Sequence, residues 1–211
     1  MTNPLAARER MIESQLRARG ISDPRVLDAM LRVPRHAFVP EPYCAEAYED
    51  HPLPIGDDQT ISQPYVVAVM LEYLQLVPTD IILEIGTGSG YVTALLAELA
   101  AQVFSIERHP DLAANARAVI EALGYRNVQT FTGDGTLGLP AQAPFGAILV
   151  SAAALDVPPA LISQLREGGR MIVPVGSPDS QQLQLIRMQD GHPVISLRDP
   201  VRFVPLISDP E

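Results

Sequence analysis

The chain has 211 residues, a formal net charge of −10 at pH 7 and a single cysteine, Cys44. A chain of this length buries a hydrophobic core without cross-links, and one cysteine excludes an internal disulfide and any zinc site built from cysteine pairs. The acidic balance and the lack of a basic cluster argue against nucleic acid as a partner, because phosphate binding depends on clustered Arg and Lys.

Signals for a membrane, for export and for a metal are all missing. No stretch approaches the roughly 20 uninterrupted apolar residues of a membrane-spanning helix, and the first residues lack the apolar segment of a secretory signal. The four histidines, His36, His51, His109 and His192, lack metal-ligand spacing such as i, i+4. We therefore expect a cytoplasmic protein, a monomer, with no metal and no membrane partner.

The N-terminal part begins with helical patterns and then becomes irregular. Apolar residues have helical spacing over residues 4–31 with a break at Gly20, and Ser22-Asp23-Pro24 is typical of a fresh helix start, which predicts two short helices. Residues 34–64 are rich in proline, which blocks long helices. A long irregular segment inside a compact domain is usually functional.

Helices and strands alternate after this segment. The predicted strands are residues 81–85, 103–106, 128–131, 147–151 and 170–175, and the predicted helices are residues 65–76, 91–100, 112–123 and 159–166. Such alternation specifies an α/β fold with a doubly wound, mostly parallel sheet covered by helices on both faces. Residues 183–188, 194–197 and 201–206 follow without helices, so we predict antiparallel strands at the C-terminal end.

A glycine-rich turn between a strand and a helix is the clearest local motif. It reads Leu83-Glu84-Ile85-Gly86-Thr87-Gly88-Ser89-Gly90. Glycine is needed at such a turn when a bound nucleotide approaches the backbone more closely than a side chain allows. A tight turn without a ligand is the alternative interpretation.

Carboxylates follow the next two predicted strands. Glu107 lies about 20 residues after the glycines, where a doubly wound fold places the acid that accepts hydrogen bonds from ribose hydroxyls. In Gly133-Asp134-Gly135 the carboxylate can accept from an adenine amino group. Read alone, each of these acids has an alternative as a solvated side chain or part of a plain turn.

The spacing of the glycines bears on the identity of the cofactor. A dinucleotide site would have its third glycine one place later, where this chain has Tyr91. The acidic Glu84 would oppose a pyrophosphate but suits a cationic sulfonium and the amino group of methionine. The pattern therefore favours S-adenosylmethionine, with S-adenosylhomocysteine as product, over a nicotinamide dinucleotide.

A run of short polar residues ends the proline-rich segment directly before a helix. The hydroxyls of Thr60 and Ser62, with the amides of the helix start, can bind a carboxylate. The alternative is that Ser62 caps the helix ahead of Pro64.

These motifs resemble the protein-L-isoaspartate O-methyltransferases over nearly the whole chain. The matching stretches are Val33-Pro34-Arg35-His36, Phe38-Val39-Pro40, Ala47-Tyr48-Glu49-Asp50, Pro52-Leu53-Pro54-Ile55-Gly56, the Glu84 to Gly90 loop, Gly133-Asp134-Gly135, Ser151-Ala152-Ala153, Gly168-Gly169-Arg170, Pro174-Val175-Gly176 and Phe203-Val204-Pro205-Leu206. In that family the Gln-Thr-Ile-Ser-Gln-Pro stretch, here residues 59–64, is the substrate-facing loop, and its serine is assigned to the active site. The resemblance thus implies Ser62 as the catalytic residue.

The resemblance and the motifs together give a full set of expected site residues. The cofactor-binding set is Glu84, Gly86, Thr87, Gly88, Gly90, Glu107, Arg108, Asp134 and Gly135. The substrate-binding set is Gln59, Thr60, Ile61, Gln63, Pro64 and Ser151. One Rossmann-like methyltransferase domain over residues 1–211 is expected, with an N-terminal helical and substrate-loop segment (1–64), a cofactor-binding core (65–176) and C-terminal antiparallel strands (177–211).

The implied reaction is methyl transfer from S-adenosylmethionine to the free carboxylate of L-isoaspartyl residues in damaged proteins or peptides. The alternatives are a related O-methyltransferase for another peptide or small-molecule acid, a nicotinamide-dependent oxidoreductase, and a cofactor-binding module without catalysis. Asp57-Asp58 stand where the family usually has an aromatic residue or histidine followed by glycine, so we expect repulsion of an anionic substrate by about 1 kcal/mol per exposed pair. Ser151 and Ile207 stand where threonine is found in other members.

Overall fold

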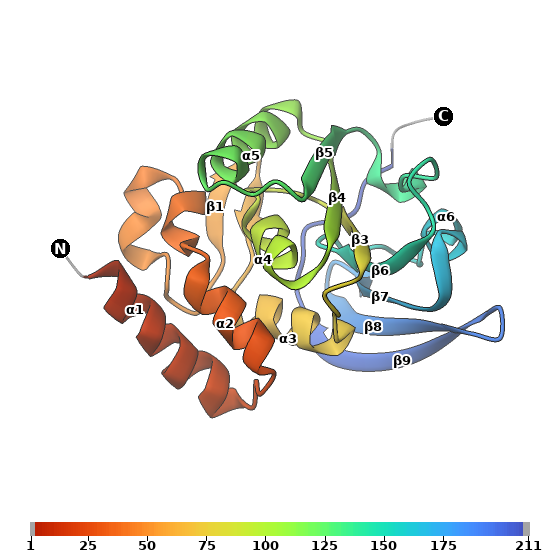
Figure 1. Ribbon diagram of the computed structural model, residues 1–211, viewed down its shortest axis with the longest axis horizontal. Helices are drawn as coiled ribbons and strands as arrows, with labels where there is room; N and C mark the ends of the chain where they lie inside the picture. The colour runs from red at the N-terminus through yellow and green to blue at the C-terminus, as the bar shows by residue number, and fades with distance from the viewer. Residues whose placement is uncertain (1–2, 209–211) are drawn as a thin grey trace.

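A seven-stranded sheet forms the centre of the computed structural model, which describes residues 3–208 (Figure 1). The strand order is β5-β4-β3-β6-β7-β8-β9, parallel from β5 to β7 and antiparallel from β7 to β9. The strands are β3 (Ile81–Ile85), β4 (Gln102–Glu107), β5 (Val128–Thr132), β6 (Phe145–Val150), β7 (Leu165–Ser177), β8 (Ser180–Gln189) and β9 (His192–Val201). This arrangement confirms the predicted fold class.

Helices pack on the sheet because successive strand residues point to opposite faces. The helices of this part are α3 (Pro64–Leu74), α4 (Tyr91–Leu99), α5 (Pro110–Ala122) and α6 (Pro159–Ser163). In β3, Ile82 belongs to a core cluster that includes residues of α3 and α4, whereas Leu83 and Ile85 belong to a second cluster with Leu161 of α6. The helix predicted for residues 159–166 is wrong at its end, since Leu165 already pairs with β6.

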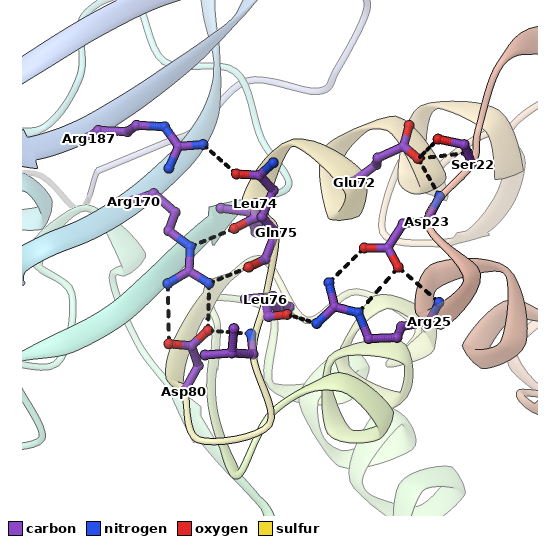
Figure 2. A network of polar contacts seen from close by, with 11 residues as sticks. Ser22, Asp23, Arg25, Glu72, Leu74, Gln75, Leu76, Asp80, Arg170 and Arg187 are labelled. Atoms are coloured by element: carbon purple, nitrogen blue, oxygen red, sulfur yellow. Dashed lines mark hydrogen bonds and ion pairs between the residues drawn. The ribbon is translucent and has the colours of Figure 1, made fainter.

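The two predicted N-terminal helices are present. The segments are α1 (Pro4–Arg10), the π-helix η1 (Met11–Leu16), the 3₁₀ helix η2 (Arg17–Arg19) and α2 (Pro24–Arg32). Gly20 ends the first with a φ of 97°, and the Asp23 carboxylate caps the second by accepting from the Arg25 backbone N–H. Glu72 of α3 accepts from the backbone N–H groups of Ser22 and Asp23 at 2.7 Å each, which docks the start of α2 on α3 (Figure 2).

The proline-rich segment contains a hairpin that the sequence analysis missed. Its elements are the 3₁₀ helices η3 (Arg35–Phe38) and η4 (Glu41–Glu46) and the antiparallel pair β1 (Leu53–Gly56) and β2 (Gln59–Ile61). Asp57 and Asp58 form the turn, with φ of 50° and 56°. A two-residue hairpin turn of type I′ has positive φ at both positions, and Asp is among the few residues that tolerate it. The turn therefore explains this acidic pair.

Substitutions at the hairpin turn should separate backbone strain from charge. Asp58→Val is expected to lower the free energy of unfolding by about 1–2 kcal/mol, because a β-branched side chain is strained at positive φ. Asp58→Asn keeps the tolerance of positive φ, removes the charge and should change stability by less than about 0.5 kcal/mol. Urea denaturation of both variants measures the difference, and equal stability of the two would contradict the assignment.

The third C-terminal strand, predicted over residues 201–206, is wrong. After β9 the chain runs across the ends of the parallel strands, where Ala153 donates to the Val204 carbonyl at 2.8 Å and accepts from the Leu206 N–H at 2.7 Å. The Gln181 side chain bonds both backbone groups of Phe203. Pro205 has no N–H to donate to a ladder, so the tail makes only isolated contacts and places its end beside β6.

None of the helices within residues 3–208 is long and apolar enough to cross a membrane.

Candidate active site

A cleft lies at the carboxyl ends of β3, β4 and β6, where the strand order reverses: β4 and β5 lie on one side of β3, and β6 and the later strands lie on the other. Open α/β sheets bind ligands at such a switch point. The lining residues are Gln59 to Ser62, Ile85 to Ser89, Tyr91, Val92, Ile106 to His109, Gly135, Ser151, Ala152 and Val204 to Ile207. The fold thus brings most of the predicted site residues together from segments far apart in the sequence.

All three glycines of the turn have positive φ, but they serve different contacts. Gly86 and Gly88 line the cleft, and an added Cβ at Gly86 would lie 3.4 Å from the Cβ of Ser151. Gly90 lies outside the cleft lining, where an added Cβ would come within 3.2 Å of Ala116 and Ile120 of α5. A side chain at Gly90 would therefore crowd α5, and the cofactor contact of Gly90 stays a prediction.

Glu107 joins the end of β4 to the glycine turn. Its side chain is buried, Oε2 accepts from the Gly88 backbone N–H at 2.8 Å, and Oε1 accepts from the His109 backbone N–H at 3.0 Å. Each carboxylate oxygen keeps a further lone pair. A carboxylate that lines the cleft and is fixed by two backbone groups suits the predicted role toward ribose hydroxyls.

Glu84 has contacts other than those expected. It is fully buried on the far side of the turn and is absent from the cleft lining. Oε2 accepts from Ser105 at 2.6 Å and from Thr93 at 2.5 Å, whereas Oε1 has no partner among the described residues. Burial raises the pKa of Glu84 to about 8, so the group is largely protonated at neutral pH. A neutral acid gives little electrostatic attraction for a sulfonium.

The contacts of Asp134 and Arg108 also differ from those expected. Asp134 caps a 3₁₀ turn, η5 (Gly135–Leu137), through Thr136 and does not line the cleft. Gly135 does line it, and an added Cβ there would lie 2.5 Å from Ile85. Arg108 lines the cleft and donates to the Ile207 carbonyl at 3.0 Å, which fixes the tail over the site.

Ser62 is not a helix cap. Helix α3 has Gln63 at its N-cap without a side-chain bond, and Asp50 accepts from the Tyr65 backbone N–H at 3.2 Å. The Tyr65 N–H is therefore occupied, whereas the sequence analysis expected the amides at the helix start to bind the substrate carboxylate. Within residues 3–208 no hydrogen bond of the Ser62 hydroxyl is found, and the residue lines the cleft. The structure therefore leaves this hydroxyl for a ligand.

The cleft continues into an adjoining outer groove. Thr60, Ser62, Ser151 and Val204 line both, and the outer groove adds Pro52, Gln63, Val66, Pro200, Val201, Arg202 and Phe203. Gln63 donates to Asp50 and borders only the groove, and Pro64 borders neither. Asp57 and Asp58 border neither, so the expected repulsion of an anionic substrate loses its structural basis.

Some lining residues were missed by the sequence analysis. They are Ile85, Ser89, Tyr91, Val92, Ile106, His109, Ala152 and Val204 to Ile207. Most of these residues lie next to a recognised motif in the sequence, and this adjacency is the signal that could have identified them. The tail reaches the cleft through contacts with residues distant in sequence, among them Ala153, Arg108 and Gln181.

Residues 6–211 match the family model described as protein-L-isoaspartate(D-aspartate) O-methyltransferase. The chain belongs to this family. A protein-L-isoaspartate O-methyltransferase of Koribacter versatilis is 58% identical over 96% of this chain and 91% of the relative. Another from Methanoculleus marisnigri is 52% identical over 95% of this chain and 91% of the relative. The resemblance noted from the motifs is thereby confirmed.

Solved structures agree with family membership. A solved protein-L-isoaspartate O-methyltransferase superposes with a TM-score of 0.85 at 31% identity over 94% of this chain, which spans 65% of that solved chain. A Plasmodium falciparum protein assigned to the same family, in complex with S-adenosyl-L-homocysteine, gives a TM-score of 0.84 at 27% identity and covers 96% of this chain and 99% of its own.

Glu107→Gln is expected to weaken S-adenosylhomocysteine binding by about tenfold or more, since a hydrogen bond to a charged group contributes about 1.5–3 kcal/mol. Glu167→Gln is the matched control, because Glu167 also accepts from two backbone N–H groups, those of Asp190 and Gly191, away from the cleft. Calorimetric titration compares the two dissociation constants. Equal weakening in both variants would show that Glu107 has no special role toward the cofactor.

Proposed function

We propose that this chain transfers the methyl group of S-adenosylmethionine to the free carboxylate of L-isoaspartyl residues in damaged proteins or peptides, a repair reaction. The observation that carries the proposal is the Ser62 hydroxyl, which has no partner in the described part of the chain and borders the same cleft as the glycine turn and Glu107. Family membership over residues 6–211 supports the same reaction.

The residues of the cleft fit S-adenosylmethionine. Gly86 and Gly88 leave the backbone open to close approach, and Glu107 retains acceptor capacity for ribose hydroxyls. Ile85 and Ile106 offer apolar surface beside them. When bound, this cofactor supplies a methyl group on a positively charged sulfur. The Thr87 and Ser105 hydroxyls are hydrogen-bonded to each other at 2.5 Å, and Ser105 also donates to the buried Glu84. These contacts hold the turn against Glu84.

The acceptor carboxylate needs orientation more than activation. A carboxylate with a pKa near 4 is ionised at neutral pH, so no general base is required. We assign Ser62 the role of donating a hydrogen bond to one carboxylate oxygen, which leaves the other oxygen free to react. Alignment of this kind supplies up to about 7–11 kcal/mol, and the apolar Ile61 and Val204 restrict water at the cleft.

The outer groove is the proposed path for the peptide on either side of the isoaspartyl residue. Among residues 3–208, Arg202 is the one charged residue that lines this groove. A cation in the groove that Ser62 also lines suits an anionic substrate. We also propose a cytoplasmic location, which the single free cysteine supports, and the monomeric state stays a prediction.

Labelled S-adenosylmethionine with an isoaspartyl peptide tests this function. Base-labile methyl ester is expected with the isoaspartyl peptide and not with the normal aspartyl peptide. Equal labelling of both peptides, or of neither while S-adenosylhomocysteine binds, would favour a related O-methyltransferase of another acid. Heat on titration with NAD would favour the oxidoreductase.

Ser62→Ala is expected to lower turnover by about tenfold, the effect of losing roughly 1.5 kcal/mol of hydrogen bonding to a charged group. The dissociation constant of S-adenosylhomocysteine should change by less than about twofold. Ser163→Ala, whose hydroxyl donates to a helix carbonyl far from the cleft, is the control and should retain full turnover. Unchanged turnover in Ser62→Ala would remove the assigned role.

A further inference from the structure

Arg35 is a fully buried cation without a carboxylate partner. Its exposed fraction is 0%, and no salt bridge involves it among residues 3–208. Burial lowers the pKa of Arg35 to about 10, so the guanidinium remains charged at neutral pH. A buried charge without a carboxylate in direct contact is costly, and Asp50 acts on Arg35 only through longer-range attraction. The contacts that the guanidinium makes must therefore compensate for its burial.

The Arg35 guanidinium contacts three segments of the chain that are separated in sequence. Nε donates to the Ala47 carbonyl at 2.7 Å, and Nη2 donates to the Ser62 carbonyl at 2.8 Å. Its central carbon lies 4.8 Å from the ring centroid of Tyr91, within the range of a cation–π contact. Arg35 therefore touches the backbone of the proposed catalytic residue directly.

Tyr91 connects the same cation to the cofactor side of the cleft. It is the first residue of α4, follows Gly90 of the glycine turn, lines the cleft and is 1% exposed. Phe38, three residues after Arg35, packs edge-on against the Tyr91 ring at 5.7 Å between centroids. The short 3₁₀ helix η3 is thus fixed to the start of α4 by two contacts, and to the substrate loop by one.

We infer that Arg35 is a positioning residue for methyl transfer, which sets the Ser62 loop at a fixed distance from the glycine turn. The inference rests on the proposed function. The guanidinium donates to two carbonyls from separate nitrogens while its central carbon lies over the Tyr91 ring, whereas a lysine ammonium is a point charge without this fixed fork. Reaction rates are sensitive to alignment, since a misplacement of about 1 Å can cost about 100-fold.

Arg35→Lys and Arg35→Met test the inference, with Arg170→Lys as matched control. Arg170 is also a buried arginine that donates to backbone carbonyls, those of Leu74, Gln75 and Gly146, but it lies outside the cleft. Calorimetric titration with S-adenosylhomocysteine counts the binding-competent sites in each preparation. Turnover of an isoaspartyl peptide at saturating substrates is then expressed per competent site. Partial unfolding of a variant therefore does not lower its measured turnover.

We expect kcat per site to fall at least tenfold in both Arg35 variants, with the dissociation constant of S-adenosylhomocysteine changed less than threefold. Arg170→Lys should retain kcat per site within twofold even where it lowers the melting temperature. A kcat per site within twofold of wild type in Arg35→Lys, or loss of all S-adenosylhomocysteine binding in that variant, would assign Arg35 a structural role only. Inactive wild-type protein would instead contradict the proposed function.

Discussion

Asp80→Asn is expected to lower the free energy of unfolding by about 3–5 kcal/mol, the cost of breaking a buried ion pair from one side. Asp80 is fully buried, and its carboxylate accepts from Arg170 at 2.6 and 3.2 Å and from the Val77 backbone N–H at 2.8 Å (Figure 2). Asparagine keeps the shape but presents an NH₂ group where only acceptors fit. It also leaves the Arg170 guanidinium buried without a counter-charge.

The same carboxylate offers its own control. Arg166 lies 3.0 Å from Asp80 Oδ1, but its side chain is 48% exposed. Solvent screening limits such a pair to about 1 kcal/mol or less, so Arg166→Gln should cost little. Urea denaturation of the two variants measures both values. A loss below about 1 kcal/mol for Asp80→Asn, or equal losses for the two, would contradict the structural assignment.

The Arg170 network also explains one of the stretches that carry the family resemblance, Gly168-Gly169-Arg170. Arg170 donates to the carbonyls of Leu74 and Gln75, which end α3, and Arg187 donates to the Gln75 side chain (Figure 2). Helix ends leave carbonyls without partners, and these donors satisfy them. The Gly168-Gly169-Arg170 stretch therefore serves stability at the end of α3 that lies farthest from Ser62.

Glu84→Gln is expected to remove a decline of stability with rising pH. The pKa of Glu84 is about 8 in the folded protein, against an ordinary value of 4.5. Below pH 4.5 both states hold the proton and stability is full; between pH 4.5 and 8 only the folded state holds it, so stability falls as pH rises by about 1.4 kcal/mol per unit. Above pH 8 the folded carboxyl ionises as well, and the decline stops.

The glutamine side chain mimics the protonated acid, because its oxygen can still accept from Thr93 and Ser105. Relative to wild type, the variant should gain a few kcal/mol of stability between pH 5 and pH 8. Denaturation curves at the two pH values measure this difference directly. Parallel pH profiles for the two proteins would show that Glu84 ionises normally inside the fold.

The polar partners of several predicted site residues differ from those that the sequence suggested. Glu84 lies one residue before the end of β3 and Glu107 ends the neighbouring β4, yet Glu84 faces α4 and Glu107 faces the cleft. The sequence left two interpretations of the Ser62 hydroxyl, a substrate contact or a helix cap. Asp50 argues against the cap, because it accepts from the Tyr65 N–H at the start of α3. Sequence spacing does not report which face of a strand a side chain meets in space.

The sequence by itself determined the order of strands and helices from α3 to β9, the glycine turn, the start of α2 at Asp23 and the family. These features depend on local rules, namely the periodicity of apolar residues, backbone conformations that only glycine adopts readily, and capping by a side chain two residues away. The tertiary structure alone decided that the tail crosses the cleft, that Gly90 lies against α5 and that Arg35 reaches Ser62. Each of these depends on groups distant in sequence, and their proximity follows from how the elements pack, which local patterns do not encode.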